Sequence, residues 1–187
     1  MGAAPEALRK IRGGRIAMVF QEPMTSLNPL HTIERQVAEV LKVHRGMGER
    51  AARKRVLELF NQVGIRDAES RLGAYPHQLS GGQRQRVMIA MALACNPKLL
   101  IADEPTTALD VTIQGQILDL ILDLVEERRM ALLLISHDLG VIAQTTRRMI
   151  VMYGGIAAEE GPTASVFGHL AHPYSKGLFA ARPSLGG

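Results

Sequence analysis

The chain has 187 residues, of which 47% are hydrophobic, and this predicts one soluble, cytoplasmic domain with a buried core. Its net charge is +4, but only 4% of its residues are aromatic, which argues against nucleic-acid binding because few rings are available for base stacking. The longest apolar run, residues 87–95, is far shorter than the ~20 residues of a membrane-spanning helix, and the single Cys95 excludes an internal disulfide.

In chain order, short apolar runs alternate with helical patterns. We expect strands at residues 15–20, 98–102 and 131–135, and helices at residues 33–41, 50–63 and 113–125 and after Ser80. Because the apolar runs do not alternate with polar residues, they are typical of strands covered on both faces, as in a mainly parallel α/β sheet. The stretch of about residues 30–78 has no strand pattern and predicts an inserted helical subdomain.

The run Leu79-Ser80-Gly81-Gly82-Gln83 precedes the helix that follows Ser80. Ser80 and Gln83 have the spacing of a capping box, which predicts a helix start at this point. Gly81 and Gly82 carry no side chain, so a phosphate can approach the backbone N–H groups at the positive end of the helix dipole. The alternative is an ordinary capped helix without a ligand.

Two adjacent acids, Asp103 and Glu104, follow the second strand and precede Pro105. Ligands of open α/β sheets bind at the C-terminal ends of the strands. In phosphoryl transfer the first acid of such a pair holds Mg²⁺, and the second can orient or deprotonate the attacking water. The alternative is a surface turn with two solvated acids, but the apolar strand and Pro105 argue against it.

Three further residues are candidates only in combination with these motifs. Gln21 follows the first strand, Asp110 precedes the helix that starts at Val111, and His137 follows the third strand. Taken singly, Gln21 is an ordinary loop residue, Asp110 is a helix cap, and His137 is part of a cap formed with Asp138.

In this order and spacing, with LSGGQRQR at residues 79–86, the five features resemble those of the ATP-binding cassette (ABC) ATPases. The resemblance implies a P-loop NTPase-like α/β nucleotide-binding domain over residues 1–187 that uses ATP and Mg²⁺. It implies that Asp103 holds Mg²⁺, that Glu104 is catalytic, and that the Q-loop residue Gln21 touches Mg²⁺ and water. It also implies that His137 contacts the γ-phosphate. The signature residues Ser80–Gln83 would reach ATP on the opposite subunit, with Asp110 at the dimer interface.

Longer strings resemble the oligopeptide/dipeptide (and nickel) importer ATPases, and TTALDVT resembles the first of their two unlike ATPase subunits. These strings are FQEPMTSLNP from residue 20, IADEPTTALDVTIQ from residue 101 and HPYSKGLFAARP from residue 172. The resemblance implies a peripheral subunit at the cytoplasmic face of the plasma (inner) membrane, with a C-terminal extension beginning at about residues 160–187. Its partners would be a related but unlike ATPase subunit, two permease subunits and, indirectly, an extracytoplasmic peptide-binding protein.

Two alternatives remain open: a non-transport ABC ATPase, and a catalytically silent partner module. No lysine of the chain lies in the P-loop pattern G-x-x-x-x-G-K-[ST], whose amides and lysine surround the phosphates. Since only residues 1–20 precede Gln21, we expect an N-terminally truncated domain that lacks the opening strands and the P-loop.

Overall fold

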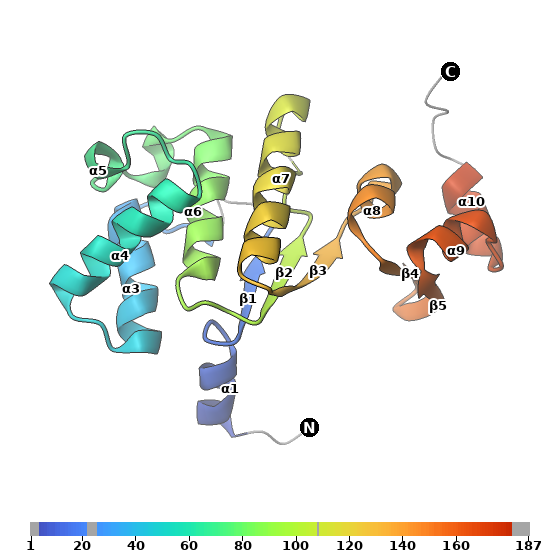
Figure 1. Cartoon of the computed structure of the whole chain (residues 1–187), viewed down its shortest axis with the longest axis horizontal. Helices are drawn as coiled ribbons and strands as arrows, with labels where there is room; N and C mark the ends of the chain where they lie inside the picture. The colour runs from blue at the N-terminus through green and yellow to red at the C-terminus, as the bar shows by residue number, and fades with distance from the viewer. Residues whose placement is uncertain (1–3, 22–25, 108, 181–187) are drawn as a thin grey trace. The chain divides into compact units, whose positions relative to one another are not determined.

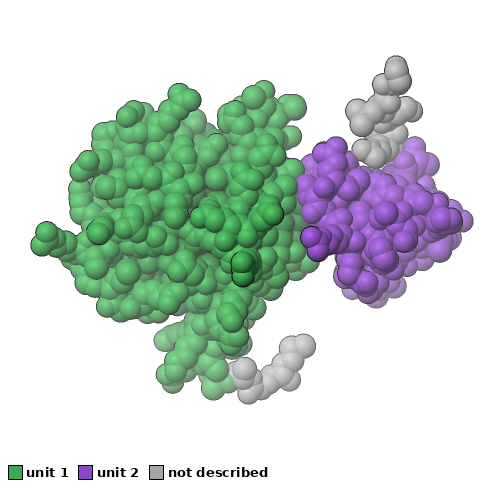
Figure 2. Space-filling model, viewed as in Figure 1, with its two compact units in different colours: residues 1–135 green, residues 136–187 purple. Residues whose placement is uncertain are grey.

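The computed structural model describes residues 4–21, 26–107 and 109–180. It divides into two compact units, residues 1–135 and 136–187 (Figure 2). The first unit contains three parallel strands, and the second contains two antiparallel strands. Parts of the three long sequence strings, at residues 22–25, 108 and 181–183, lie outside the described residues.

The first unit alternates helices with strands, as the sequence predicts (Figure 1). In chain order it contains α1 (Pro5–Ile11), β1 (Ile16–Val19), α3 (Ile33–Arg45), α4 (Glu49–Gln62), α5 (Ala68–Arg71), the short 3₁₀ helix η1 (Pro76–Gln78), α6 (Gly81–Leu93), β2 (Leu99–Asp103), α7 (Val111–Glu127) and β3 (Ala131–Ile135). The predicted α/β fold, with a parallel sheet and an inserted helical segment, is confirmed.

The parallel sheet has the strand order β1-β2-β3. Val19 lies opposite Ala102, and Asp103 lies opposite Ile135, so the C-terminal ends of all three strands meet at one edge. The N-terminal ends of α6 and α7 lie at this same end of the unit (Figure 1). Residues that follow the strands therefore lie at the same end of the unit as two helix N-termini.

The expected cover on both faces of the sheet is wrong for β3. Leu133 and Ile135 remain 48% and 44% exposed, and burial alternates along β2 and β3 instead of being continuous. Within the first unit, the face on which Leu133 and Ile135 lie is only partly covered. The unbroken apolar run was therefore a misleading sign of two-sided burial.

The helical segment between β1 and α6 follows its sequence pattern closely. Thr32 caps α3 by accepting a hydrogen bond from the Arg35 N–H at 3.3 Å, and α3 ends at Gly46 in the left-handed conformation (φ 62°). Gly64 has a φ of 73° just beyond α4, where glycine is favoured because it has no Cβ. The buried side chains of this segment share one core with β1, α6 and α7. Its status as a separate subdomain stays a prediction.

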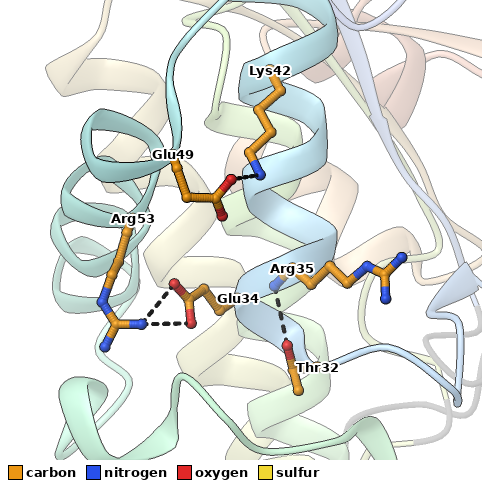
Figure 3. A network of polar contacts seen from close by, with 6 residues as sticks. All are labelled: Thr32, Glu34, Arg35, Lys42, Glu49 and Arg53. Carbon is orange, nitrogen blue, oxygen red and sulfur yellow. Dashed lines mark hydrogen bonds and ion pairs between the residues drawn. The ribbon is translucent and has the colours of Figure 1, made fainter.

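Two ion pairs also join α3 to α4 (Figure 3). Arg53 Nη1 lies 3.0 Å from each carboxylate oxygen of Glu34, and Lys42 pairs with Glu49. Pairs as exposed as these contribute only ~0–1 kcal/mol each. The buried apolar residues of the two helices therefore carry most of their attachment; they are Ile33, Val37, Ala38, Leu41, Ala52, Val56, Leu59 and Phe60.

The second unit contains α8 (Leu139–Thr145), β4 (Arg148–Tyr153), β5 (Ile156–Pro162), α9 (Thr163–Gly168) and α10 (Pro173–Ala180). Glu159 on β5 accepts hydrogen bonds from the backbone N–H groups of Ala171 and His172, at 2.9 and 3.3 Å. Tyr153 stacks on Tyr174 with the ring centroids 4.3 Å apart. These contacts attach the segment HPYSKG, residues 172–177, to the β4–β5 hairpin. Its role as the start of a C-terminal extension stays a prediction. Within the described ranges, no helix is long and apolar enough to cross a bilayer.

Candidate active site at the sheet edge

Gln21 and Glu104 meet at the C-terminal edge of the sheet. Gln21 lies two residues beyond β1, and Glu104 directly follows β2, the neighbouring parallel strand. Gln21 Nε2 donates a hydrogen bond to Glu104 Oε2 at 3.3 Å, although the two residues are 83 positions apart. The structure thus brings together two residues that the sequence identified separately.

The backbone of Glu104 is fixed in an unusual conformation. Its N–H donates to the carbonyl of Ile135 at 2.9 Å, which continues the β2–β3 ladder, yet its φ is +44°. A non-glycine residue in this region costs ~1–3 kcal/mol, and such residues gather at functional sites. Pro105 is buried and Glu104 is half-buried, so the pair is not a solvated surface turn.

The donors at this edge suit magnesium held jointly with a phosphate. Asp103 is half-buried at the last position of β2, and Gln21 uses its amide nitrogen on Glu104, which leaves its amide oxygen as an acceptor. Among the described residues there is no cluster of three or more His, Cys, Asp or Glu that would hold a metal unaided. Mg²⁺ ordinarily takes one or two carboxylates and completes its shell with water and phosphate oxygens. Asp103 and Gln21 therefore fit such an ion only together with a nucleotide.

The capping box at the start of α6 is present as predicted. Gln83 N–H donates to Ser80 Oγ at 3.3 Å, and Ser80 N–H donates to Gln83 Oε1 at 3.0 Å. The N–H groups of Gly81 and Gly82 have no hydrogen-bond partner within the described part of the chain. These two donors lie at the positive end of the helix, where an anion is favoured.

The two glycines also have a packing role that the sequence did not reveal. A Cβ on Gly82 would lie 2.8 Å from Ile113 Cγ2, and one on Gly81 would lie 3.1 Å from Leu109 Cδ2. The first turn of α6 is therefore packed closely against the start of α7. Close helix packing is a sufficient reason for glycine here, independent of any phosphate.

Asp110 caps α7, since its Oδ1 accepts a hydrogen bond from the Ile113 N–H at 3.0 Å. The side chain is exposed, and its neighbours Leu109 and Ile113 face Gly81 and Gly82 in the first turn of α6. The cap predicted from the sequence is thus present. Its place at a dimer interface, and the nucleotide contact of Ser80–Gln83, stay predictions.

His137 belongs to the second unit and is exposed. The next residue, Asp138, caps α8 by accepting hydrogen bonds from the N–H groups of Gly140 and Val141, at 2.7 and 3.2 Å. The role of His137 at the γ-phosphate stays a prediction.

Sequence reasoning missed Thr107. Its Oγ1 donates to Glu104 Oε2 at 2.8 Å, on the same carboxylate oxygen that Gln21 contacts. The available signal was Pro105, because a proline at the second position of a tight turn brings the fourth residue back toward the first. The Thr107 N–H does close this turn on the Glu104 carbonyl at 3.2 Å.

Known protein families and solved structures resemble this chain in sequence and fold. The sequence profile described as ABC transporter matches residues 4–107, more than half of the chain. The chain is 59% identical over 177 residues to the peptidoglycan transport ATP-binding protein of Agrobacterium fabrum, with 95% of this chain and 32% of that protein covered. It is 55% identical over 177 residues to the dipeptide transport ATP-binding protein of Escherichia coli, with 95% and 54% covered.

Among solved structures, a dimeric ATP-binding cassette in a post-hydrolysis state with ADP and phosphate matches with a TM-score of 0.74 at 36% identity. The match covers 86% of this chain and 68% of that one. The chain spans about half of the E. coli relative and about a third of the A. fabrum relative.

Proposed function

The chain belongs to the ABC transporter family, and from that premise we propose that it is part of an ATP-hydrolysing subunit of a peptide importer. The observation that carries the chemical part of the proposal is the convergence of Gln21 and Glu104 beside Asp103 at the sheet edge. This convergence supports the proposal, because phosphoryl transfer needs a base and a metal, and a carboxylate could serve as the base while two further side-chain oxygens could bind the metal.

Glu104 is proposed as the general base. Its carboxylate accepts a proton from the water that attacks the γ-phosphorus, while ADP leaves, and a positioned base contributes ~10²–10⁴ in rate. Asp103 and the Gln21 amide oxygen would hold Mg²⁺, which supplies neutralising charge for the β- and γ-phosphate oxygens when bound. Gln21 then touches both the base and the metal position through the two ends of one amide.

The signature helix is proposed to act on a second subunit. The Gly81 and Gly82 N–H groups have no partner in the described residues, and they lie at the start of α6. They would bind the γ-phosphate of ATP on a related but unlike ATPase subunit, with Asp110 at the interface. His137 would contact the γ-phosphate bound to its own chain.

The transport role is proposed from the relatives. One is named for dipeptide transport and another for peptidoglycan transport. Both names describe substrates with peptide parts, which supports peptides as the solute class. The subunit would then lie at the cytoplasmic face of the membrane and drive two permease subunits. No observation favours a non-transport ATPase or a silent module.

A hybrid chain tests the proposal directly. It is the E. coli dipeptide transport ATP-binding protein with its matched 177 residues replaced by the corresponding residues of this chain. We expect the hybrid chain to hydrolyse ATP and to restore dipeptide uptake in a strain lacking the E. coli protein. A stably folded hybrid chain that hydrolyses no ATP would contradict the proposed chemistry, and ATPase activity without uptake would contradict only the transport role.

A further inference from the structure

The Glu104 carboxylate is held by a second donor that none of the sequence motifs identified. Thr107 Oγ1 donates to Glu104 Oε2 at 2.8 Å, while Gln21 Nε2 donates to the same oxygen at 3.3 Å. We propose that Thr107 is a positioning residue, which orients Glu104 for proton transfer. This inference rests on the proposed function, because it concerns the general base of that reaction.

The turn after β2 accounts for the position of Thr107. Pro105 has its ring-fixed φ at the second position of the turn, and the Thr107 N–H closes the turn on the Glu104 carbonyl at 3.2 Å. The left-handed Glu104 (φ 44°) sets the direction in which the turn leaves the sheet. The hydroxyl of Thr107 therefore comes back beside the side chain of Glu104, without any longer-range contact being needed.

An ordinary threonine in a turn or helix would make a different bond. Thr145 and Thr146 donate to backbone carbonyls four residues earlier, at 2.7 and 2.8 Å, as threonines in such positions commonly do. Thr107 donates to a half-buried carboxylate instead. A hydrogen bond to an ionised group is stronger than one between neutral groups, so this bond restrains the Glu104 side chain.

The restraint has a direct consequence for catalysis. Gln21 and Thr107 approach Oε2 from different segments, the residues after β1 and the turn after β2, so together they restrain rotation of the carboxylate. A base that is displaced by about 1 Å can lose ~10²-fold in rate. Loss of Thr107 should therefore lower kcat. The KM for ATP should hardly change, because Thr107 contacts Glu104, which is proposed as the base and not as a nucleotide ligand.

Three variants separate positioning from a merely structural role. Thr107→Val removes the donor at nearly constant shape, and Thr107→Ser keeps the donor. Thr106→Val is the matched control, because the hydroxyl of Thr106 makes no hydrogen bond to Glu104 in the described residues. If Thr107→Val loses helical circular dichroism, Thr107→Ala replaces it as the variant without the donor.

The first measurement uses the 187-residue chain with ¹³C at the glutamate carboxyl carbons. The Glu104 signal is the one that disappears in Glu104→Gln. We expect Thr107→Val to move this signal, and Thr107→Ser and Thr106→Val to leave it close to its original position. An unmoved signal in Thr107→Val would show that the hydrogen bond is absent and would overturn the inference whatever the enzyme does.

The second measurement is steady-state hydrolysis of ATP by the hybrid chain. We expect Thr107→Val to lower kcat ~10-fold or more, with the KM for ATP within about twofold, and Thr107→Ser to restore most of kcat. A hybrid chain that needs Glu104 but keeps its kcat in Thr107→Val overturns the positioning role alone. A hybrid chain that is indifferent to Glu104→Gln overturns the proposed function, and the inference falls with it.

Discussion

Gly82 faces Ile113 so closely that a methyl group on Gly82 would lie 2.8 Å from Ile113 Cγ2. The starts of α6 and α7 are thereby locked together, next to the two backbone N–H groups proposed to bind phosphate. Glycine at this position has two possible reasons, packing within the chain and access for a phosphate. The two reasons predict different behaviour on substitution.

Gly82→Ala should destabilise the chain by about 1–2 kcal/mol. Overpacking costs ~1–3 kcal/mol, and the better helix propensity of alanine offsets up to ~1 kcal/mol of this. Ile113→Ala removes the opposing methyl, so in a double-mutant cycle the two substitutions should show a coupling of at least ~1 kcal/mol. Urea unfolding of the four chains measures both quantities.

If Gly82 serves only to give a phosphate access to the helix start, its substitution should give a different result. Gly82→Ala would then be as stable as the unmodified chain, the cycle would show no coupling to Ile113, and only the ATPase activity of the hybrid chain would fall. Gly46, which has open space around its Cβ position, does not serve as a control because its φ of 62° is itself unfavourable for alanine. Gly115, with open space and an ordinary φ on α7, is the matched control, and Gly115→Ala should be neutral or stabilising.

Glu104→Gln in the hybrid chain should keep ATP binding and lower turnover by ~10²–10⁴. The amide is nearly isosteric with the carboxylate and can still accept from Gln21 and Thr107, but it cannot take the proton of the attacking water. ATP affinity by calorimetry and phosphate release measure the two effects separately. Glu127→Gln, an exposed acid at the end of α7, is the control and should change neither. Near-normal turnover in Glu104→Gln would remove Glu104 from the role of base.

The sequence was informative wherever the structure depends on local spacing. The capping box of Ser80 and Gln83 and the cap at Asp110 are each set by residues within a few positions of each other, and both are observed. The edge position of Asp103 and Glu104 follows from the apolar strand before them.

Contacts between segments that are distant in the sequence could not be predicted from local residue spacing. The contact of Gly82 with Ile113 depends on how α6 packs on α7, and the bond of Gln21 to Glu104 depends on β1 pairing with β2. The exposure of Leu133 depends on which layers cover the sheet, and this is a property of the packing around β3 and not of its own residues.

The hydrogen bonds that attach the HPYSKG segment to Glu159 should depend on pH. The hydrogen bond from the Ala171 N–H, helped by His172, holds the pKa of the Glu159 carboxyl below its usual value. A lowered folded-state pKa means that the carboxylate stabilises the folded unit fully above the unfolded pKa of about 4.3. This contribution is lost as the pH falls through the lower, folded-state pKa.

We therefore expect the amides of Ala171 and His172 to be protected from hydrogen exchange at pH 6 and to lose protection in strongly acidic solution. Glu159→Gln should reduce protection most at pH 6, and its difference from the unmodified chain should shrink in acid. Glu160→Gln, which removes the exposed partner of Arg148, is the control and should leave these two amides unchanged. Equal protection at all pH values in the unmodified chain would contradict this account.

The 187-residue chain alone should show no magnesium-dependent ATPase activity above background. Asp103 and Glu104 would act on a nucleotide bound to this chain, but its sequence contains no P-loop motif to surround the phosphates. Loss of one preorganised donor to a transition-state oxygen already costs ~10²–10³ in rate, and a P-loop supplies several. Phosphate release by the purified chain measures this, and turnover comparable to the hybrid chain would contradict it.

The signature helix should nevertheless serve ATP on another subunit. Mixed with a hybrid chain whose own Ser80 is replaced by Ala, the 187-residue chain should raise ATP hydrolysis, because its intact α6 N-terminus can face the nucleotide of the hybrid chain. Ser80→Ala in the 187-residue chain should abolish this gain. Thr32→Ala is the matched control, since it removes an N-cap of similar strength (~1 kcal/mol) from α3. If Thr32→Ala abolished the gain as fully as Ser80→Ala, stability and not phosphate binding would explain the effect, and the assignment of the signature to a second subunit would fail.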